Sequence, residues 1–373
     1  MNAPRTLPPM SLPIHPSSAL AKRLRDVRRC AAAILATLLA ACDGGSAPGT
    51  PSALPPSTDA AQGGAAVAAL DKVSIQLNWV AEPEFGGFYA AEQKALFQLE
   101  GLEVTLVQGG PDVPAPQLVA SGKVPFAIVA GPQIAELAEK GGDLVAIYSV
   151  YQGNPMGVMV HAGSPHQTLE ALWRSDATVA IQQGLADYRW LAKQFGGERL
   201  RVVPYSSNLA QFAADKSLGA QCFVISEPVT LELQGVATRV FMIGESGYDP
   251  YNCVLACRRD YFERNRDLCA RLVKACAAGW RAYLDQPRPV NEAMARLNPA
   301  MSVEAMDKAA ERQRTLVEND ETKRLGLGGM RLARWQTTVD QLVEMGDLKP
   351  AAGEGRVDAT RFFHWDPDAG TAR

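Results

Sequence analysis

The sequence predicts an α/β protein with two lobes and a helical C-terminal part. Apolar strand-like runs alternate with helical stretches from residue 72 to about residue 243, and the chain beyond residue 260 is nearly all helical in pattern. This alternation is typical of a mostly parallel sheet that is covered by helices. A length of 373 residues fits two domains of roughly 150 residues each. With 47% hydrophobic and 21% charged residues, the composition is that of a folded globular protein.

The N-terminal segment, residues 1–41, is predicted to be a lipoprotein signal peptide. A basic cluster at 22–29 precedes about a dozen apolar residues, which are too few for a stable membrane span. The segment ends in Leu39-Ala40-Ala41-Cys42, which resembles the bacterial lipobox, where the cysteine is acylated and becomes the new N-terminus. The alternative is an ordinary signal with an incidental Cys42. Because Asp43 resembles the signal that retains lipoproteins, we expect an anchor in the inner cell membrane, with the protein facing the periplasm or the outside.

Residues 42–70 are expected to form a flexible tether, since they are mostly Gly, Ala, Pro and Ser and have few apolar side chains to bury. The folded body then runs from about Lys72 to Trp365, and residues 346–373 form a C-terminal tail. The first 41 residues carry six basic side chains and one acidic side chain, so their removal shifts the net charge from −3 to −8. Such an acidic chain is a poor nucleic-acid binder, because that function needs clustered Lys and Arg.

Cysteine and histidine spacing gives no sign of a metal site or of a catalytic thiol. Five cysteines lie beyond Cys42, and none has the CxxC or Cys/His spacing of zinc ligands. Cys253 and Cys257 share a predicted strand, and Cys269 and Cys276 share a predicted helix, so neither pair can close a local disulfide. We therefore expect free, buried cysteines, and no metal, cofactor or catalytic residue.

The elements follow one another in the order of an α/β fold. The first set of strands is predicted at 73–79, 103–107, 126–130 and 144–148, with helices at 85–99 and 132–140. A second set of strands is predicted at 157–160, 178–181, 201–203, 221–225 and 239–243, and the C-terminal helices at 260–285, 288–297, 303–317 and 331–345. No G-x-G-x-x-G follows a strand and no G-x-x-x-x-G-K-[ST] occurs, so nucleotide hydrolysis and hydride transfer lack their usual motifs.

The stretch from Leu77 to Val104 resembles the opening of one family of solute-binding proteins. It reads Leu-Asn-Trp at 77–79, Glu-Pro-Glu-Phe-Gly-Gly-Phe-Tyr at 82–89 and Glu-Gly-Leu-Glu-Val at 100–104. Weaker matches follow in order at 120–127, 226–228, 248–255 and 278–284. The resemblance is to ABC-importer binding proteins for thiamine-pyrimidine precursors, riboflavin and alkanesulfonates, and it covers about 72–345.

This resemblance implies the two-lobe, type II periplasmic-binding-protein fold, often called a Venus flytrap, with a solute held in the cleft. The chain would cross between lobes near Gly153–Gly157 and near Gly247–Asn252, which contain the Gly and Pro typical of hinges. Lobe 1 would then comprise 72–154 plus 252–345, and lobe 2 would comprise 156–247. The expected partners are a small heterocyclic solute, an ABC permease with its ATPase and the membrane through the N-terminal lipid. We expect a monomer. A binding lobe that serves a sensor is a further alternative.

Ligands of open α/β sheets bind beyond the carboxyl ends of the strands, which points to a small set of loops. Asn78 is an amide in an otherwise apolar strand, and Trp79 offers a face for stacking on a planar ring, although it also suits a core position. Glu227 can accept from an exocyclic amine, or can simply be a solvated residue at a helix N-terminus. Tyr89 suits helix core as well as a site, and Tyr151 and Tyr251 flank the crossings. The expected ligand-binding residues are Asn78, Trp79, Glu84, Tyr89, Asp112, Gln133, Gln183, Glu227, Tyr151 and Tyr251.

The expected ligand is a thiamine-precursor pyrimidine. The selected cleft loops hold amides and carboxyls without a cation, whereas a sulfonate site is expected to use Arg or Lys with hydroxyls and backbone N–H groups. Riboflavin is the closest alternative, because residues 108–112 also resemble riboflavin binders. One family branch, the fungal pyrimidine synthase, is an enzyme with pyridoxal phosphate on a lysine and a histidine four residues later. Val129 and Gln133 occupy those positions here, so we expect no enzyme.

Overall fold

The computed structural model describes residues 69–206, 208–351 and 356–365. These residues form two five-stranded mixed sheets with helices around them, so the α/β, two-lobe fold predicted from the sequence is confirmed. We call the two parts lobe 1 and lobe 2 after their sheets. The predicted signal peptide, Cys42 and nearly all of the predicted tether lie outside the described residues. The predicted lobe boundaries at 154–156 and 247–252 stay predictions.

The sheet of lobe 1 places a late strand between two early ones. Its order is β2 (Leu102–Val107), β1 (Asp71–Gln76), β3 (Phe126–Val129), β10 (Asn252–Arg258) and β4 (Leu144–Tyr151). β1 is parallel to β2 and β3, whereas β10 is antiparallel to both β3 and β4. The predicted, mostly parallel arrangement is thus interrupted by a single antiparallel strand.

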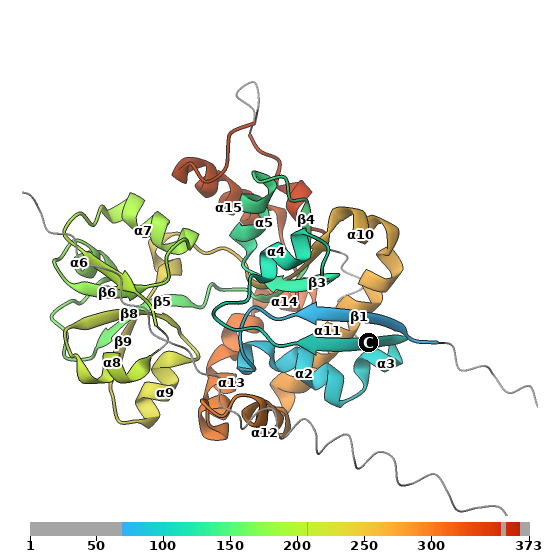
Figure 1. The fold of residues 1–373 in the computed structure, drawn as a ribbon, viewed down its shortest axis with the longest axis horizontal. Helices are drawn as coiled ribbons and strands as arrows, with labels where there is room; N and C mark the ends of the chain where they lie inside the picture. Colours follow the sequence, from blue (N-terminus) through green and yellow to red (C-terminus); the bar gives the residue numbers. More distant parts are fainter. Residues whose placement is uncertain (1–68, 207, 352–355, 366–373) are drawn as a thin grey trace, which may run out of the picture. The chain divides into compact units, whose positions relative to one another are not determined.

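The sheet of lobe 2 repeats this arrangement. Its order is β7 (Arg201–Pro204), β6 (Thr178–Ile181), β8 (Leu218–Phe223), β5 (Met156–His161) and β9 (Thr238–Met242). β6 is parallel to β7 and β8, and β5 is antiparallel to β8 and β9. Figure 1 labels β5, β6, β8 and β9 of this sheet, with α6 to α9 around them. These four helices are α6 (Leu169–Trp173), α7 (Ala186–Phe195), α8 (Leu209–Ala214) and α9 (Glu227–Leu233).

The remaining helices come before and after lobe 2 in the chain. Before it lie the 3-10 turn η1 (Pro83–Phe85), α2 (Gly86–Gln93), α3 (Leu96–Leu99), α4 (Ala115–Ala120) and α5 (Gly131–Ala138). At the end of lobe 2 lies η2 (Ile243–Ser246). After it come α10 (Arg259–Arg264), α11 (Arg266–Asp285), α12 (Arg288–Leu297), α13 (Val303–Val317), α14 (Asp320–Leu325), α15 (Leu332–Met345) and η3 (Ala359–Phe362). None of the helices in the described ranges is long and apolar enough to cross a membrane.

Two predicted helices are each divided. The helix predicted at 85–99 breaks at Ala95, whose φ of 53° is in the left-handed region, and the helix predicted at 260–285 breaks at Asn265. The strand predicted at 73–79 ends at Gln76, so Asn78 and Trp79 lie in the following loop. The five body cysteines are free and buried, as predicted.

Helices α2 and α11 pack closely against each other in lobe 1. A Cβ added to Gly87 would lie 2.2 Å from Cγ of Trp280, and one added to Gly279 would lie 2.2 Å from the Gly87 carbonyl oxygen. Both glycines therefore permit a helix–helix distance that no other residue allows without a shift. Glycines 86 and 87 therefore serve tight helix packing, with Trp280 and Tyr283 fully buried against them.

Candidate functional site

The loop after β1 is held close to the loop after β2 by a glycine. The N–H of Gly109 donates to the carbonyl oxygen of Trp79 at 3.0 Å. A Cβ at Gly109 would lie 2.3 Å from the carbonyl oxygen of Leu77, so only glycine allows the two loops to approach this closely. The half-buried side chains of Asn78 and Trp79 are thereby presented at the edge of the lobe 1 sheet.

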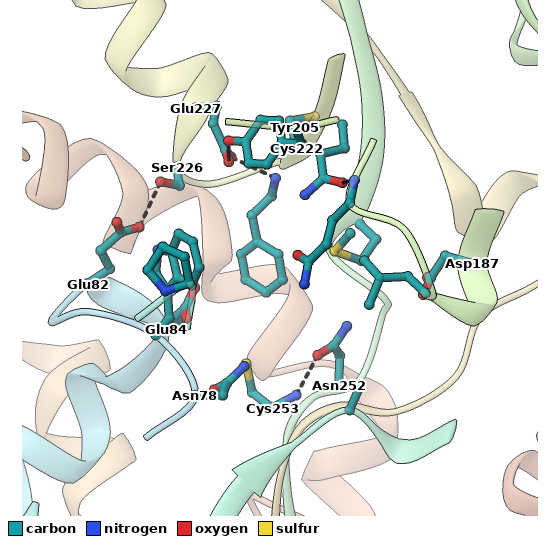
Figure 2. A pocket seen from close by; sticks show the side chains of 18 of the residues that line it. Asn78, Glu82, Glu84, Asp187, Tyr205, Cys222, Ser226, Glu227, Asn252 and Cys253 are labelled. Carbon is teal, nitrogen blue, oxygen red and sulfur yellow. Dashed lines mark hydrogen bonds between the residues drawn. The ribbon is translucent and has the colours of Figure 1, made fainter. Parts of the chain in front are cut away.

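These side chains open onto a cavity of about 200 Å³ that residues of both lobes line. Lobe 1 contributes the loop after β1, the 110–116 segment and the N-terminal end of α5, and lobe 2 contributes β8 and the loops that precede α7, α8 and α9. The polar and sulfur-containing lining residues are Asn78, Trp79, Glu82, Glu84, Gln133, Met156, Gln182, Asp187, Tyr205, Gln221, Cys222, Ser226, Glu227, Asn252 and Cys253. Figure 2 shows how most of these side chains surround the space.

Glu82 links the two lobes across this cavity. Its Oε2 accepts a hydrogen bond of 2.7 Å from the Ser226 hydroxyl, although the two residues are 144 positions apart in the chain (Figure 2). Burial raises the pKa of Glu82 to about 7, and the nearby Glu227 carboxyl acts in the same direction. The bond from Ser226 partly offsets the increase. Glu82 therefore changes charge close to neutral pH.

Glu227 is the first residue of α9, and hydrogen bonds from its own lobe hold it in place. Its Oε1 accepts from the Tyr205 hydroxyl at 2.6 Å, and its Oε2 accepts from the Phe223 N–H at 2.7 Å. Burial raises the pKa of Glu227, whereas these two bonds lower it. Both oxygens have a donor before any ligand binds. Glu227 therefore acts on a ligand mainly through its negative potential, and not as an acceptor without a donor.

Glu84 is the carboxyl that lacks a donor. Its side chain is 5% exposed, and no hydrogen bond to it occurs within the described ranges. Burial raises its pKa well above the usual range, and the carboxyls of Glu82 and Glu227 act in the same direction. The Oδ1 atom of Asn78 is likewise buried without a hydrogen-bond partner. An unpaired buried acceptor is costly, so Asn78 Oδ1 is a place where a ligand donor stabilises the structure, and the Glu84 carboxyl is free to bond to the same ligand.

A network around Asn154 connects the cavity to the two segments in which the crossings are predicted. The Asn154 side chain donates to Asp187 Oδ1 at 2.7 Å and accepts from Asn252 Nδ2 at 3.1 Å, and its backbone N–H donates to Asp249 Oδ1 at 2.6 Å. Asp187 and Asn252 line the cavity, whereas Asp249 belongs to the second crossing. Next in the chain, Cys253 has a φ of 49°, which is unusual for a residue other than glycine. Cys253 itself lines the cavity.

No Lys, Arg or His side chain lines the cavity in the part of the chain that the structure describes. The lining instead carries four carboxyls, five amides, two hydroxyls and two thiols. Such a site has negative potential and many acceptors, which suits a neutral or positively charged ligand that is rich in N–H donors.

Five of the ten residues that the sequence suggested line this cavity, and the other five do not. Asn78, Trp79, Glu84, Gln133 and Glu227 are brought together there. Gln133 also has a structural role, because its Oε1 accepts from the Ala130 N–H at 2.9 Å and caps α5.

The other five lie elsewhere for identifiable reasons. The Tyr151 hydroxyl donates to Gln313 Oε1 at 2.7 Å, and Tyr251 packs under the Arg334 guanidinium, whose Cζ lies 4.4 Å from the ring centroid. Tyr89 is buried in α2 within the hydrophobic core. Asp112 and Gln183 are exposed, while their neighbours Pro111 and Gln182 line the cavity instead.

The most informative residues that the sequence reasoning missed are Glu82, Asp187, Gln221 and Asn252. Glu82 is two positions from Glu84 in the same motif, so a signal for it was present. Gln221 is an amide inside the apolar strand β8, the same kind of signal that identified Asn78. Its Oε1 accepts from the Gln182 N–H. Asp187 and Asn252 carry no comparable mark in the sequence.

The two sheets and the cavity that both lobes line define a protein with the periplasmic-binding-protein fold. Residues 82–289, more than half of the chain, match the model of the NMT1/THI5-like family. The chain belongs to this family, as its resemblance to the pyrimidine and riboflavin binders predicted.

Relatives with curated descriptions cover different shares of the chain. The riboflavin-binding protein RibY of Chloroflexus aurantiacus is 24% identical over 265 residues, which are 68% of this chain and 73% of RibY. A Haemophilus influenzae protein named for thiamine biosynthesis is 32% identical over 92 residues, which are 25% of this chain. The chain matches only 29% of the length of that relative.

Solved structures support the fold. The periplasmic aliphatic sulphonate-binding protein SsuA of Escherichia coli superposes with a TM-score of 0.58 at 16% identity, over 79% of this chain and 92% of SsuA. The fold also occurs in an enzyme, because the desulfurization enzyme DszB superposes with a TM-score of 0.51 at 14% identity, over 76% of this chain and 95% of that chain.

Proposed function

We propose that this protein is the extracytoplasmic substrate-binding subunit of an ABC importer, that it is anchored to the membrane by a lipid on Cys42, and that it delivers its solute to a permease and ATPase. Its family, its fold and a ligand-sized cavity between two lobes support this role. RibY and SsuA, which it resembles, are described as binding proteins.

We propose that the solute is a thiamine-precursor pyrimidine. The observation that carries this proposal is the cavity chemistry: the buried Asn78 Oδ1 lacks a donor, the buried Glu84 lines the cavity, and no cation lines the cavity in the described part of the chain. An aminopyrimidine supplies N–H donors for both acceptors and a flat ring for the indole face of Trp79. The name of the Haemophilus relative agrees with this ligand class.

The size of the cavity favours a single ring over a flavin. Pockets for drug-sized ligands span about 300–1,000 Å³, whereas this cavity holds about 200 Å³. A riboflavin, with three fused rings and a ribityl chain, needs a wider separation of the lobes than this structure has. Riboflavin remains the second candidate because RibY is a relative over 68% of the chain.

An alkanesulfonate fits the cavity less well, although SsuA shares the fold. A sulfonate placed against four carboxyls without a neighbouring cation would be repelled, and its oxygens would meet acceptors such as Asn78 Oδ1 and Glu84. Catalysis of the pyrimidine-synthase kind lacks its amine, because Val129 is fully buried in β3 and Gln133 caps α5.

A thermal-shift screen of the purified protein tests the ligand. At 100 times its dissociation constant, a ligand adds about 2.7 kcal/mol of stability. We expect 4-amino-5-hydroxymethyl-2-methylpyrimidine to raise the melting temperature, and Asn78→Ala to abolish most of that increase. Asn208→Ala, which removes an exposed amide at the start of α8, serves as the matched control and should keep it. Stabilisation by aliphatic sulfonates alone would refute the assignment.

Two further experiments test the anchor and the motion. Radioactive palmitate should label the wild type and Cys30→Ala but not Cys42→Ala, and equal labelling of all three would contradict the lipid anchor.

If the crossings near 153–157 and 247–252 are hinges, saturating pyrimidine should reduce the radius of gyration in solution scattering. An unchanged scattering profile would indicate a rigid cleft.

A further inference from the structure

We propose that the cavity captures a basic nitrogen heterocycle together with one proton, which Glu84 shares with a ring nitrogen of the ligand. This inference rests on the proposed function and specifies the protonation state in which the solute is bound. It starts from one observation: Glu84 is 95% buried, lines the cavity and has no hydrogen-bond donor within the described ranges.

The surroundings of Glu84 contain no positive charge to hold it as an anion. From its own segment it faces the carboxyl of Glu82, and from α9 it faces that of Glu227. The Tyr151 hydroxyl and the Cys253 thiol are also near, and burial raises the pKa of each, with the Glu84 carboxyl acting in the same direction. Asp187 adds a fourth carboxyl to the cavity wall from α7. In this setting a free Glu84 holds its proton, because a second or third negative charge in a closed space is unfavourable.

A protonated carboxyl has one donor and one acceptor in the same plane. An aminoheterocycle has the complementary edge, with a ring nitrogen that accepts and a neighbouring amine that donates. The pair can therefore form two parallel hydrogen bonds. If the ring nitrogen is the stronger base in the cavity, the O–H bond of Glu84 breaks and an N–H bond forms on the ring, which leaves a carboxylate beside a heterocyclic cation. No further reactant is consumed.

Asn78 completes this recognition. Its unpaired Oδ1 can accept the second amine hydrogen, so one ligand bonds to both Asn78 and Glu84. Glu82 and Glu227 keep the donors that they already have, Ser226 and the pair Tyr205 and Phe223. Their negative charge then favours the cationic form of the bound ring.

A shared proton makes the affinity depend on pH. Above the pH at which free Glu84 loses its proton, each ligand must bring one from solution, so the affinity falls by up to tenfold per pH unit. Glu82, with a pKa of about 7, is coupled to Glu84, so the fall in affinity on the alkaline side reports on the cluster as a whole. At acid pH the free ligand is already protonated, so its binding displaces a proton from the site and the affinity falls again.

Titration calorimetry of the purified protein with 4-amino-5-hydroxymethyl-2-methylpyrimidine, in buffers of different ionisation enthalpy, measures this proton directly. On the alkaline side, where free Glu84 has lost its proton, we expect uptake of about one proton per ligand. Glu84→Gln retains the shape but cannot hold the proton, so it should weaken binding at neutral pH and remove the alkaline slope. Glu263→Gln, an exposed substitution on α10, should keep both properties of the wild type.

A second ligand tests the proposal without any mutation. An aminobenzyl alcohol of the same outline has no ring nitrogen, so it should bind more weakly and without proton uptake. Two results would overturn the shared proton and leave the pyrimidine assignment intact. One is pyrimidine binding without proton exchange at any pH, and the other is an equal alkaline slope of affinity against pH in the wild type and Glu84→Gln. If the wild type binds no pyrimidine at any pH but responds to another solute, the proposed ligand itself fails, and this inference fails with it.

Discussion

Replacing Asn154 by alanine should destabilise the protein more than any exposed asparagine substitution. The Asn154 side chain is 2% exposed and makes three hydrogen bonds, to Asp187 Oδ1, from Asn252 Nδ2 and from the Met156 N–H. Alanine leaves all three partners without their Asn154 bond, and one of them is a carboxyl that is itself 6% exposed. The change removes hydrogen bonds and little volume, so its cost reports on the network.

The expected cost follows from the bonds that are lost. A hydrogen bond to a charged group contributes about 1.5–3 kcal/mol, and each buried polar group left unpaired costs about 1–3 kcal/mol. Allowing for water that enters the vacated space, we expect a loss on the order of 3–5 kcal/mol in the free energy of unfolding. That is a large share of the roughly 5–15 kcal/mol that stabilises a typical domain.

The loss of unfolding free energy caused by Asn154→Ala should also depend on pH, and it should increase as the pH rises. Burial raises the pKa of Asp187, and the hydrogen bond from Asn154 lowers it, so Asn154→Ala should raise this pKa further. A folded state that binds a proton more tightly than the unfolded chain loses stability as pH rises between the two pKa values. The cost of Asn154→Ala should therefore be larger at about pH 7.5 than at about pH 5.

Urea unfolding at both pH values measures this prediction, with Asn208→Ala as the control for loss of an exposed side-chain hydrogen bond. We expect the control to lose about 1 kcal/mol, as helix N-cap substitutions do, at either pH. A cost for Asn154→Ala below about 1 kcal/mol, or an equal cost at both pH values, would refute the reasoning.

Three further predictions concern the cavity and its surroundings. Gly109→Ala should weaken ligand binding at least tenfold in calorimetry, because the new Cβ would lie 2.3 Å from the Leu77 carbonyl oxygen, whereas Gly163→Ala, with nothing within 4 Å, should bind normally. At pH 8, Cys222 and Cys253 should react with iodoacetamide far more slowly in the folded protein than in the urea-unfolded chain, because burial raises the pKa of both thiols. Equal reaction rates in mass spectrometry would contradict this. Lys308→Ala should change the unfolding free energy by less than about 1 kcal/mol, because its ion pair with Glu232 is solvent-exposed, and a larger loss would assign it a role between α9 and α13.

The sequence was most informative where one residue type had a single physical explanation. An amide after an apolar run, as at Asn78, indicates a polar contact at the sheet edge, and the structure places it at the cavity. Alternation of strands and helices likewise predicted the class of both sheets, because period and length are local properties.

Side-chain direction at the crossings was not predictable in the same way. Tyr151 and Tyr251 flank the crossings, but their hydroxyls bond to Gln313 and to the Arg331 N–H, 162 and 80 positions later in the chain. Asp187 reaches the cavity because Asn154 and the start of α7 hold it there. Such partners are brought together only by the tertiary fold, so no local pattern marks them.

The position of β10 in the lobe 1 sheet has a consequence for the order of folding. β10 spans Asn252–Arg258 and lies between β3 and β4, which are both complete before residue 152. When β1 to β4 have been synthesised, the strand that pairs with both β3 and β4 is still missing, because β10 begins about 100 residues after β4 ends. All strands of lobe 2 lie within 156–242, so lobe 2 can assemble as one continuous segment. Lobe 1 must wait for the chain to return, and until then the open edges of β3 and β4 remain free for a chaperone or a neighbouring chain to bind.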